Sequence, residues 1–238
     1  MTEPVIASRK SSRPVGRPRR LSLDDVLDAG VAVGLENLTM GAVAERLGVR
    51  VTVLYNYVAN RDELVRLASA RVAHAHPFPT DRGQHWAVYV CEHSLALFEL
   101  LTGPGDILTS FITGGQGPEV EIDRAEACLT VLKDRGIEPR DGFILQRKLN
   151  EIVIGGAVNA LHIRALEATG SDYSALARMA VKARGDDEIP LLKQVTAVFA
   201  EKPLLWKSNL VYMLQSVAST RGEQLDEAAL YTALGDEK

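Results

Sequence analysis

The side chains with the clearest chemical meaning lie in one short segment, residues 39–61. Between Thr39 and Arg61 the apolar residues are spaced as in two short helices joined by a turn at Gly48. Ala44 is small where the two helices would cross, and Gly48 can take the positive φ that such a turn needs. This spacing is typical of a helix-turn-helix, whose second helix enters the major groove of DNA. A helical hairpin without a DNA role is the alternative.

A basic arm precedes this segment. Residues 1–20 contain six Lys or Arg and one acid, a net charge of +5 in a chain whose total is −4. The tripeptide Gly16-Arg17-Pro18 resembles the core of an AT-hook, an extended strand that lies in the narrow minor groove of A·T-rich DNA. A transit peptide and a solubilising tail are the alternatives. We expect three arginines of this arm to lie in the minor groove: Arg17, Arg19 and Arg20.

Length and composition limit the class of protein. The 238 residues suit two domains or one large one, and 46% hydrophobic with only 5% aromatic residues indicates a folded, aliphatic chain. No apolar run is long enough to span a bilayer, and we find neither a secretory signal nor zinc spacing, a phosphate loop or a nucleophile elbow. We expect a cytoplasmic, nucleoid-associated bacterial protein without cofactor or metal. Cys91 and Cys128 are expected as buried free thiols, with a redox-sensing pair as the alternative.

Capping signals and apolar periodicity predict helices almost throughout. Ser22 with Asp25, and Asn60 with Glu63, have the capping-box pattern, and Thr39 is a third N-cap. Further helices are expected from residue 81 or 84 to 103, and over residues 104–113, 119–135, 139–170, 190–201 and 203–221. Residues 171–189 and 222–238 are left without an assigned structure. We divide the chain into an arm (1–20), a helix-turn-helix domain (21–76) and a helical domain (77–238), with the boundary at Pro77 and Pro79.

The motif resembles that of TetR-family transcriptional repressors. The residues that carry the resemblance are Leu38-Thr39-Met40, Val43-Ala44, Leu47-Gly48-Val49 and Leu54-Tyr55-x-Tyr57-Val58-x-Asn60-Arg61-x-x-Leu64. It is specific over roughly residues 21–67. The resemblance implies an all-α fold, with a three-helix DNA-binding domain at the N-terminus and a larger helical domain for ligand binding and dimerisation. It also implies a homodimer that binds double-stranded DNA at a palindromic operator.

The resemblance also implies DNA contacts. It places phosphate contacts at Thr39, Tyr55 and Arg61, and puts Tyr57 where a histidine is expected. The turn and the base-facing start of the recognition helix are Arg50, Val51, Thr52 and Val53. Gly41 stands where a guanine-reading arginine is expected, and the two valines can touch thymine methyl groups but cannot hydrogen-bond a base. We therefore expect weak base reading by the helix, with much of the affinity supplied by the arm.

The second domain is expected to bind a small, largely apolar effector of unknown identity. His93 follows the apolar stripe of its predicted helix, and Asn150 shares a face with apolar residues in the long helix. A buried polar group needs a partner, which is either another side chain or a ligand. Phe98 and Phe111 are expected as apolar walls. For each of these four residues, ordinary core packing is the alternative.

Two glycines in the long helix, Gly155 and Gly156, indicate close approach by another backbone, because each costs roughly 1 kcal/mol relative to alanine. A second apolar face surrounds them, and the last long helix is apolar as well. The family layout pairs these helices with their copies in a dimer. The candidate dimer residues are Ile152, Gly156, Asn159, Leu210 and Leu214, and an ordinary buried face within one subunit is the alternative.

Together these features predict a ligand-responsive homodimeric repressor that releases its operator when an effector binds. The alternative is an architectural dimer that binds A·T-rich DNA through the arm and has no effector. A helical enzyme with a vestigial motif is a third class, but the sequence shows no catalytic constellation and we do not expect an enzyme.

Overall fold

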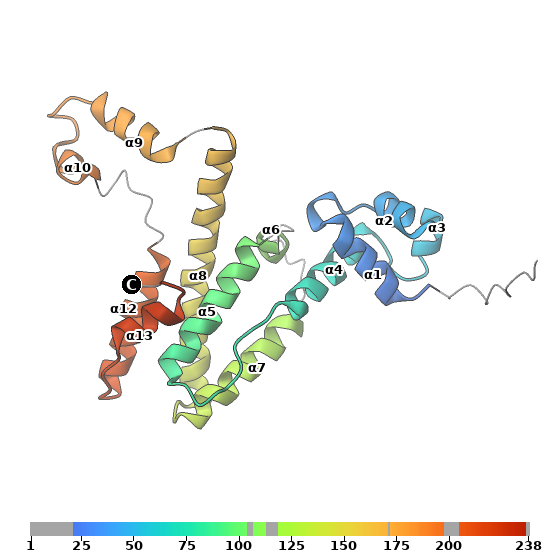
Figure 1. Cartoon of the computed structure of the whole chain (residues 1–238), viewed down its shortest axis with the longest axis horizontal. Helices are drawn as coiled ribbons and strands as arrows, with labels where there is room; N and C mark the ends of the chain where they lie inside the picture. The colour runs from blue at the N-terminus through green and yellow to red at the C-terminus, as the bar shows by residue number, and fades with distance from the viewer. Residues whose placement is uncertain (1–20, 104–106, 113–118, 171, 198–204, 237–238) are drawn as a thin grey trace, which may run out of the picture.

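The computed structural model describes residues 21–103, 107–112, 119–170, 172–197 and 205–236, in which every regular element is a helix (Figure 1). The predicted all-α fold is therefore confirmed. The arm that contains Arg17, Arg19 and Arg20 lies outside the described residues. Within the described parts of the chain, no helix combines the length and apolarity that crossing a membrane requires.

The N-terminal helices are α1 (Leu23–Val33), α2 (Met40–Leu47), α3 (Val51–Leu54) and α4 (Arg61–Ala75), with a short 3₁₀ turn, η1 (Leu35–Asn37), after α1. Ser22 and Asp25 form the predicted capping box, and the Thr39 hydroxyl accepts the N–H of Ala42 at 3.1 Å. The Asn60 side chain caps α4 as expected. The Glu63 carboxylate, however, accepts the N–H of Ala59, so that half of the second predicted box is wrong.

The helices of this unit pack around one apolar core. The side chains of Val26, Leu38, Val43, Leu54 and Leu64 are completely buried there. The turn between α2 and α3 has Gly48 at φ 66°, the left-handed conformation that glycine adopts without a steric penalty. Burial of Leu54 fixes α3 against α2, so the opposite side of α3 faces solvent.

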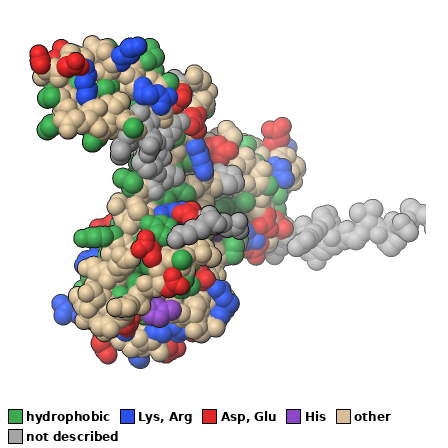
Figure 2. Space-filling view, turned by 60° about the vertical axis from the view of Figure 1, so that its left-hand side comes forward, with side chains coloured by type: hydrophobic (Ala, Val, Ile, Leu, Met, Phe, Trp, Pro, Cys, Tyr) green, Lys and Arg blue, Asp and Glu red, His purple; other side chains and the backbone are tan. Residues whose placement is uncertain are grey.

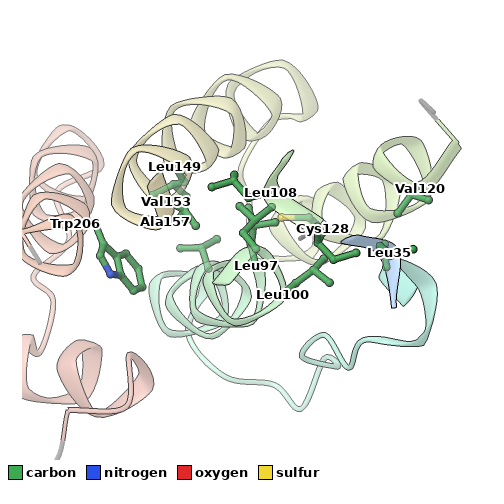
Figure 3. Close-up of a cluster of buried hydrophobic side chains, with 14 of the residues drawn as sticks. Leu35, Leu97, Leu100, Leu108, Val120, Cys128, Leu149, Val153, Ala157 and Trp206 are labelled. Atoms are coloured by element: carbon green, nitrogen blue, oxygen red, sulfur yellow. The ribbon is translucent and has the colours of Figure 1, made fainter. Parts of the chain in front are cut away.

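The second part is built around α5 (Trp86–Thr102) and α8 (Pro139–Ala168), which pack side by side. The body also contains α6 (Ile107–Ile112), α7 (Glu119–Asp134) and α12 (Trp206–Thr220). Side chains from α5, α7 and α8 converge on one buried cluster that includes Leu97, Cys128 and Val153 (Figure 3). The helix predicted from residue 81 or 84 begins at Trp86, because the His85 side chain caps it.

Three further helices end the described chain. Two of them occupy segments left unassigned above: α9 (Tyr173–Lys182) and α13 (Glu227–Ala233), whose Leu230 is buried in the body. The third, α10 (Pro190–Gln194), covers the first part of the helix predicted over residues 190–201, of which residues 198–201 lie outside the described residues. Helices α9 and α10 form a lobe that stands apart beyond the end of α8 (Figures 1 and 2). Met179 and Leu191 are exposed on that lobe.

Helix α4 belongs to both parts of the molecule. It packs on α1 in the N-terminal unit and also contacts α6 and α7 (Figure 1). The buried Ser110 hydroxyl of α6 donates to the Ser69 hydroxyl of α4 at 2.8 Å. The division at residue 76 stays a prediction, since α4 ends at Ala75 but its second half is held by the helices that follow.

Both cysteines are buried free thiols. Burial raises the pKa of Cys91 and of Cys128 to about 12. Because oxidation proceeds through the thiolate, such thiols react slowly, and this supports the structural interpretation over the redox-sensing pair.

Candidate DNA-binding surface and effector pocket

The outer side of α3 carries the side chains predicted to read bases. Val51 and Thr52 are exposed and Val53 is half-buried, while Leu54 points into the core. Arg50 is exposed directly before the helix. These residues therefore form one accessible surface, as a base-reading role requires.

All three predicted phosphate contacts present a polar group to solvent. The Tyr55 side chain is 56% exposed and its hydroxyl makes no hydrogen bond within the described residues. The Arg61 Nε–H donates to the Leu38 carbonyl at 2.8 Å, and the remainder of the guanidinium reaches solvent. Thr39 is exposed, but its oxygen accepts the bond that caps α2, which leaves its hydroxyl proton for a phosphate.

Tyr57 has an internal partner. Its hydroxyl donates to the Leu21 carbonyl at 2.7 Å, and its ring is half-buried. Its hydroxyl therefore holds the start of α1 against the end of the recognition segment, and is not directed at DNA as its place in the motif suggested. The sequence could not reveal this bond because its partners are 36 positions apart.

We expect Tyr55→Phe to weaken DNA binding roughly tenfold, because a hydrogen bond to a charged group contributes about 1.5–3 kcal/mol. Its melting temperature should barely change, since the hydroxyl has no internal partner among the described residues. The matched control is Tyr57→Phe, which should lower the melting temperature and leave the DNA affinity of the folded protein unchanged. Fluorescence anisotropy and thermal unfolding measure the two effects. A large decrease in the melting temperature of Tyr55→Phe with normal DNA affinity would show that its hydroxyl stabilises the fold.

A cavity of about 320 Å³ lies among α5, α7 and α8. It brings together three of the four predicted ligand residues: His93 from α5, Phe111 from α6 and Asn150 from α8. Phe98 is not among its lining residues. It stacks instead on Trp206 of α12, with ring centroids 4.7 Å apart and planes inclined by 19°. The role of Phe98 as a pocket wall is therefore corrected to packing between α5 and α12.

Two polar residues of the cavity that are buried or half-buried were missed in the sequence. Gln146 of α8 is only 6% exposed, and its Oε1 has no hydrogen-bond partner among the described residues. Arg124 of α7 donates an Nη2–H to the Ala73 carbonyl of α4 at 2.7 Å, and its guanidinium lies 4.4 Å from the centre of the Phe78 ring. A signal for Arg124 exists, because it interrupts an apolar stripe formed by Val120, Cys128 and Val131.

Burial and charge set the protonation states inside the cavity. Burial, with a smaller contribution from nearby Arg124, lowers the pKa of His93 to about 4. Burial also lowers the pKa of Arg124 to about 10. At pH 7 the cavity therefore contains a neutral imidazole and a charged guanidinium.

The predicted dimer residues divide into three groups. Leu210 and Leu214 are completely buried inside the subunit, so their assignment to a dimer surface is corrected to the subunit core. Gly156 is approached by Trp206 of the same chain, and a Cβ at this position would lie 2.6 Å from the Trp206 Cβ. Ile152 is half-buried and Asn159 is exposed, both beside a shallow groove between α8 and α12.

Two curated relatives are transcriptional repressors. The class E tetracycline repressor of Escherichia coli is 26% identical over 148 residues, which are 58% of this chain and 68% of that protein. The repressor DrrR1 of Streptomyces coeruleorubidus is 29% identical over 159 residues, which are 63% of this chain and 58% of that protein. The match to DrrR1 thus spans less than two thirds of its length. No protein-family model matches the chain.

Solved structures of TetR-family regulators have the same fold. ActR of Streptomyces coelicolor in complex with (S)-DNPA superposes with a TM-score of 0.64 at 20% identity, over 85% of this chain and 98% of ActR. BioQ with its double-stranded DNA operator superposes with a TM-score of 0.50 at 23% identity, over 63% of this chain and 93% of BioQ. The relatives and the fold together confirm the predicted resemblance to TetR-family repressors.

Proposed function

We propose that this chain, which has the fold of TetR-family regulators and TetR-type repressors as its relatives, is a homodimeric repressor of the bacterial cytoplasm. It binds a palindromic operator and releases it when a small, largely apolar effector enters the cavity among α5, α7 and α8. One observation carries the proposal. Helix α4 begins beside the exposed recognition segment, and its last turn is hydrogen-bonded to the cavity residue Arg124.

Through this arrangement, a conformational change at the cavity can be transmitted to the DNA-binding surface. A displacement of α7 around a ligand changes the position of the Ala73 end of α4, and α4 packs on α1 of the DNA-binding unit. In a dimer, this alters the separation of the two recognition segments. The effector acts only through its different affinities for the two states, and a hundredfold loss of operator affinity corresponds to about 2.7 kcal/mol of coupling.

The architectural alternative has less support. A domain that only dimerises has no use for a cavity that contains buried polar groups such as His93 and Gln146. Filling that space with apolar side chains would stabilise such a domain. The cavity therefore favours a sensor.

Dimerisation is tested by light scattering at micromolar concentration. We expect about twice the 25.9 kDa mass of the chain, and two chains on one operator duplex. Tyr212 of α12 is 76% exposed in the subunit and follows by three residues Asn209, which lines the groove between α8 and α12. Tyr212→Glu should therefore promote dissociation without unfolding the chain. A stable monomer bound to a single half-site would contradict the proposal.

A further inference from the structure

Arg124 brings to the cavity a positive charge that pairs with no acid among the described residues. Arg124 is half-buried, and among the described residues it forms no ion pair. Glu121 acts on it through space and favours its charged form, but Glu121 is exposed and too weak a partner to offset the effect of burial. A guanidinium removed from water in this way is stabilised by an anion that reaches it.

A second observation points to a ligand in the same cavity. The Gln146 Oε1 is buried without a hydrogen-bond partner in the described parts of the chain, although the residue lines the cavity. Buried acceptors in native proteins are nearly always satisfied. An O–H or N–H donor on a bound molecule would supply the missing bond.

The remaining walls are mainly apolar. Leu97, Phe111, Phe143 and Ile154 surround the space, whose volume of about 320 Å³ is at the lower end of the usual range for small-molecule sites. We propose that the effector is a small amphipathic acid, whose anionic group binds Arg124, whose donor group binds Gln146 and whose apolar body fills the rest. The inference rests on the proposed function and defines what its cavity binds.

Other charges line the cavity but do not reverse this preference. Arg147, Glu121 and Glu151 are all exposed, so water solvates them and salt screens them. The half-buried Arg124 acts in a lower dielectric than these exposed groups, and a charge has a larger effect there. A cationic ligand would bring a second positive charge to the guanidinium, and a neutral one would leave it unpaired.

The same guanidinium gives the acid a route to α4. Arg124 holds the Ala73 carbonyl in the last turn of that helix. An anion is a stronger acceptor than a peptide carbonyl, so it competes for the guanidinium and loosens the bond between α7 and α4. Recognition of the acid and release of DNA thereby share one side chain.

The test uses two fluorescent probes with the same aromatic framework. 8-Anilinonaphthalene-1-sulfonate is an anion, and N-phenyl-1-naphthylamine lacks only the sulfonate. Titration of the full chain by fluorescence should show the sulfonate binding at least roughly tenfold more tightly, the factor that one charge-assisted hydrogen bond provides. Equal affinities, or no binding of the sulfonate, would overturn the proposal.

Matched variants test whether the anionic group binds at Arg124. Arg124→Met keeps an apolar stem and should remove the advantage of the sulfonate while preserving binding of the neutral probe, which also reports an intact cavity. Arg147→Met removes an exposed arginine of the same cavity and should change neither affinity. Arg124→Lys keeps the positive charge, so the sulfonate probe should still bind somewhat more tightly than the neutral probe. If the sulfonate probe still binds more tightly than the neutral probe in Arg124→Met, the anionic group does not bind Arg124.

Gln146→Leu tests the donor group. Both probes carry one N–H, so both should bind several-fold more weakly to this variant, and unchanged affinities would exclude the contact. Operator binding is measured separately without probe. If the probe experiments fail but the protein binds its operator normally, only the proposal of an acidic effector is rejected. If the probes bind as expected but the protein binds no operator, the proposed repressor function is rejected.

Discussion

Removal of residues 1–20 is expected to weaken operator binding at least roughly hundredfold at 0.1 M salt. Six of the 27 Lys and Arg residues lie in this arm, and the rest of the chain is acidic. If three or four of these cations meet phosphates or the minor groove, the slope of log affinity against log salt should fall by roughly three. The exposed surface of α3 offers few groups that can hydrogen-bond bases, which makes the contribution of the arm large.

Anisotropy titrations at several salt concentrations measure this slope. Thermal unfolding should be unaffected, because the arm has few apolar residues to contribute to a core. A full-length variant with Arg17, Arg19 and Arg20 replaced by glutamine keeps the length of the arm and should lose most of the same slope. An unchanged slope and affinity after deletion would reduce the arm to a solubilising tail.

Gly156→Val is expected to lower the free energy of unfolding by about 3 kcal/mol, the upper end of the usual range for overpacked cores. A Cβ at Gly156 would lie 2.6 Å from the Trp206 Cβ, and Trp206 is buried and stacked on Phe98. The indole cannot withdraw without separating α12 from α8. Chemical denaturation of the purified protein measures the loss.

Gly155→Val is the matched control. A Cβ at Gly155 meets nothing within 4 Å in the subunit. The helix propensity of valine is more favourable than that of glycine by only about 0.3 kcal/mol. Its unfolding free energy should therefore change little. Light scattering on both variants separates a loss of folding from a loss of dimerisation. Equal stability of the two variants would show that the contact between Gly156 and Trp206 does not hold α12 in place.

Local signals in the sequence predicted the helix starts and the turn of the DNA-binding unit. Ser22, Thr39 and Asn60 each begin a helix where their side chains predict one, and Gly48 turns the chain between α2 and α3. These are interactions over three or four residues, which the sequence shows directly. The helices at α9 and α13 were missed because both are short and lie in polar segments. Leu230 of α13 is buried through contacts with α5 and α12, which the local sequence does not show, whereas α9 packs on the preceding helix α8.

The cavity was predictable only in part. His93 and Asn150 were found as polar groups on apolar helix faces, and the same reasoning applied to α7 would have found Arg124. Periodicity shows that a face is buried but not what covers it. For that reason Leu210 and Leu214 were assigned to a dimer surface although their own subunit buries them, and Phe98 was assigned to the cavity although Trp206 covers it.

The central claim is that this chain recognises one DNA sequence as a dimer. Selection of bound duplexes from a random library, at physiological salt and with excess competitor DNA, tests it most directly. We expect enrichment of a single palindrome whose half-sites are about one helical turn or more apart, flanked by A·T-rich steps for the arms. Enrichment of A·T-rich DNA without any palindrome would contradict it and would identify an architectural DNA-binding protein.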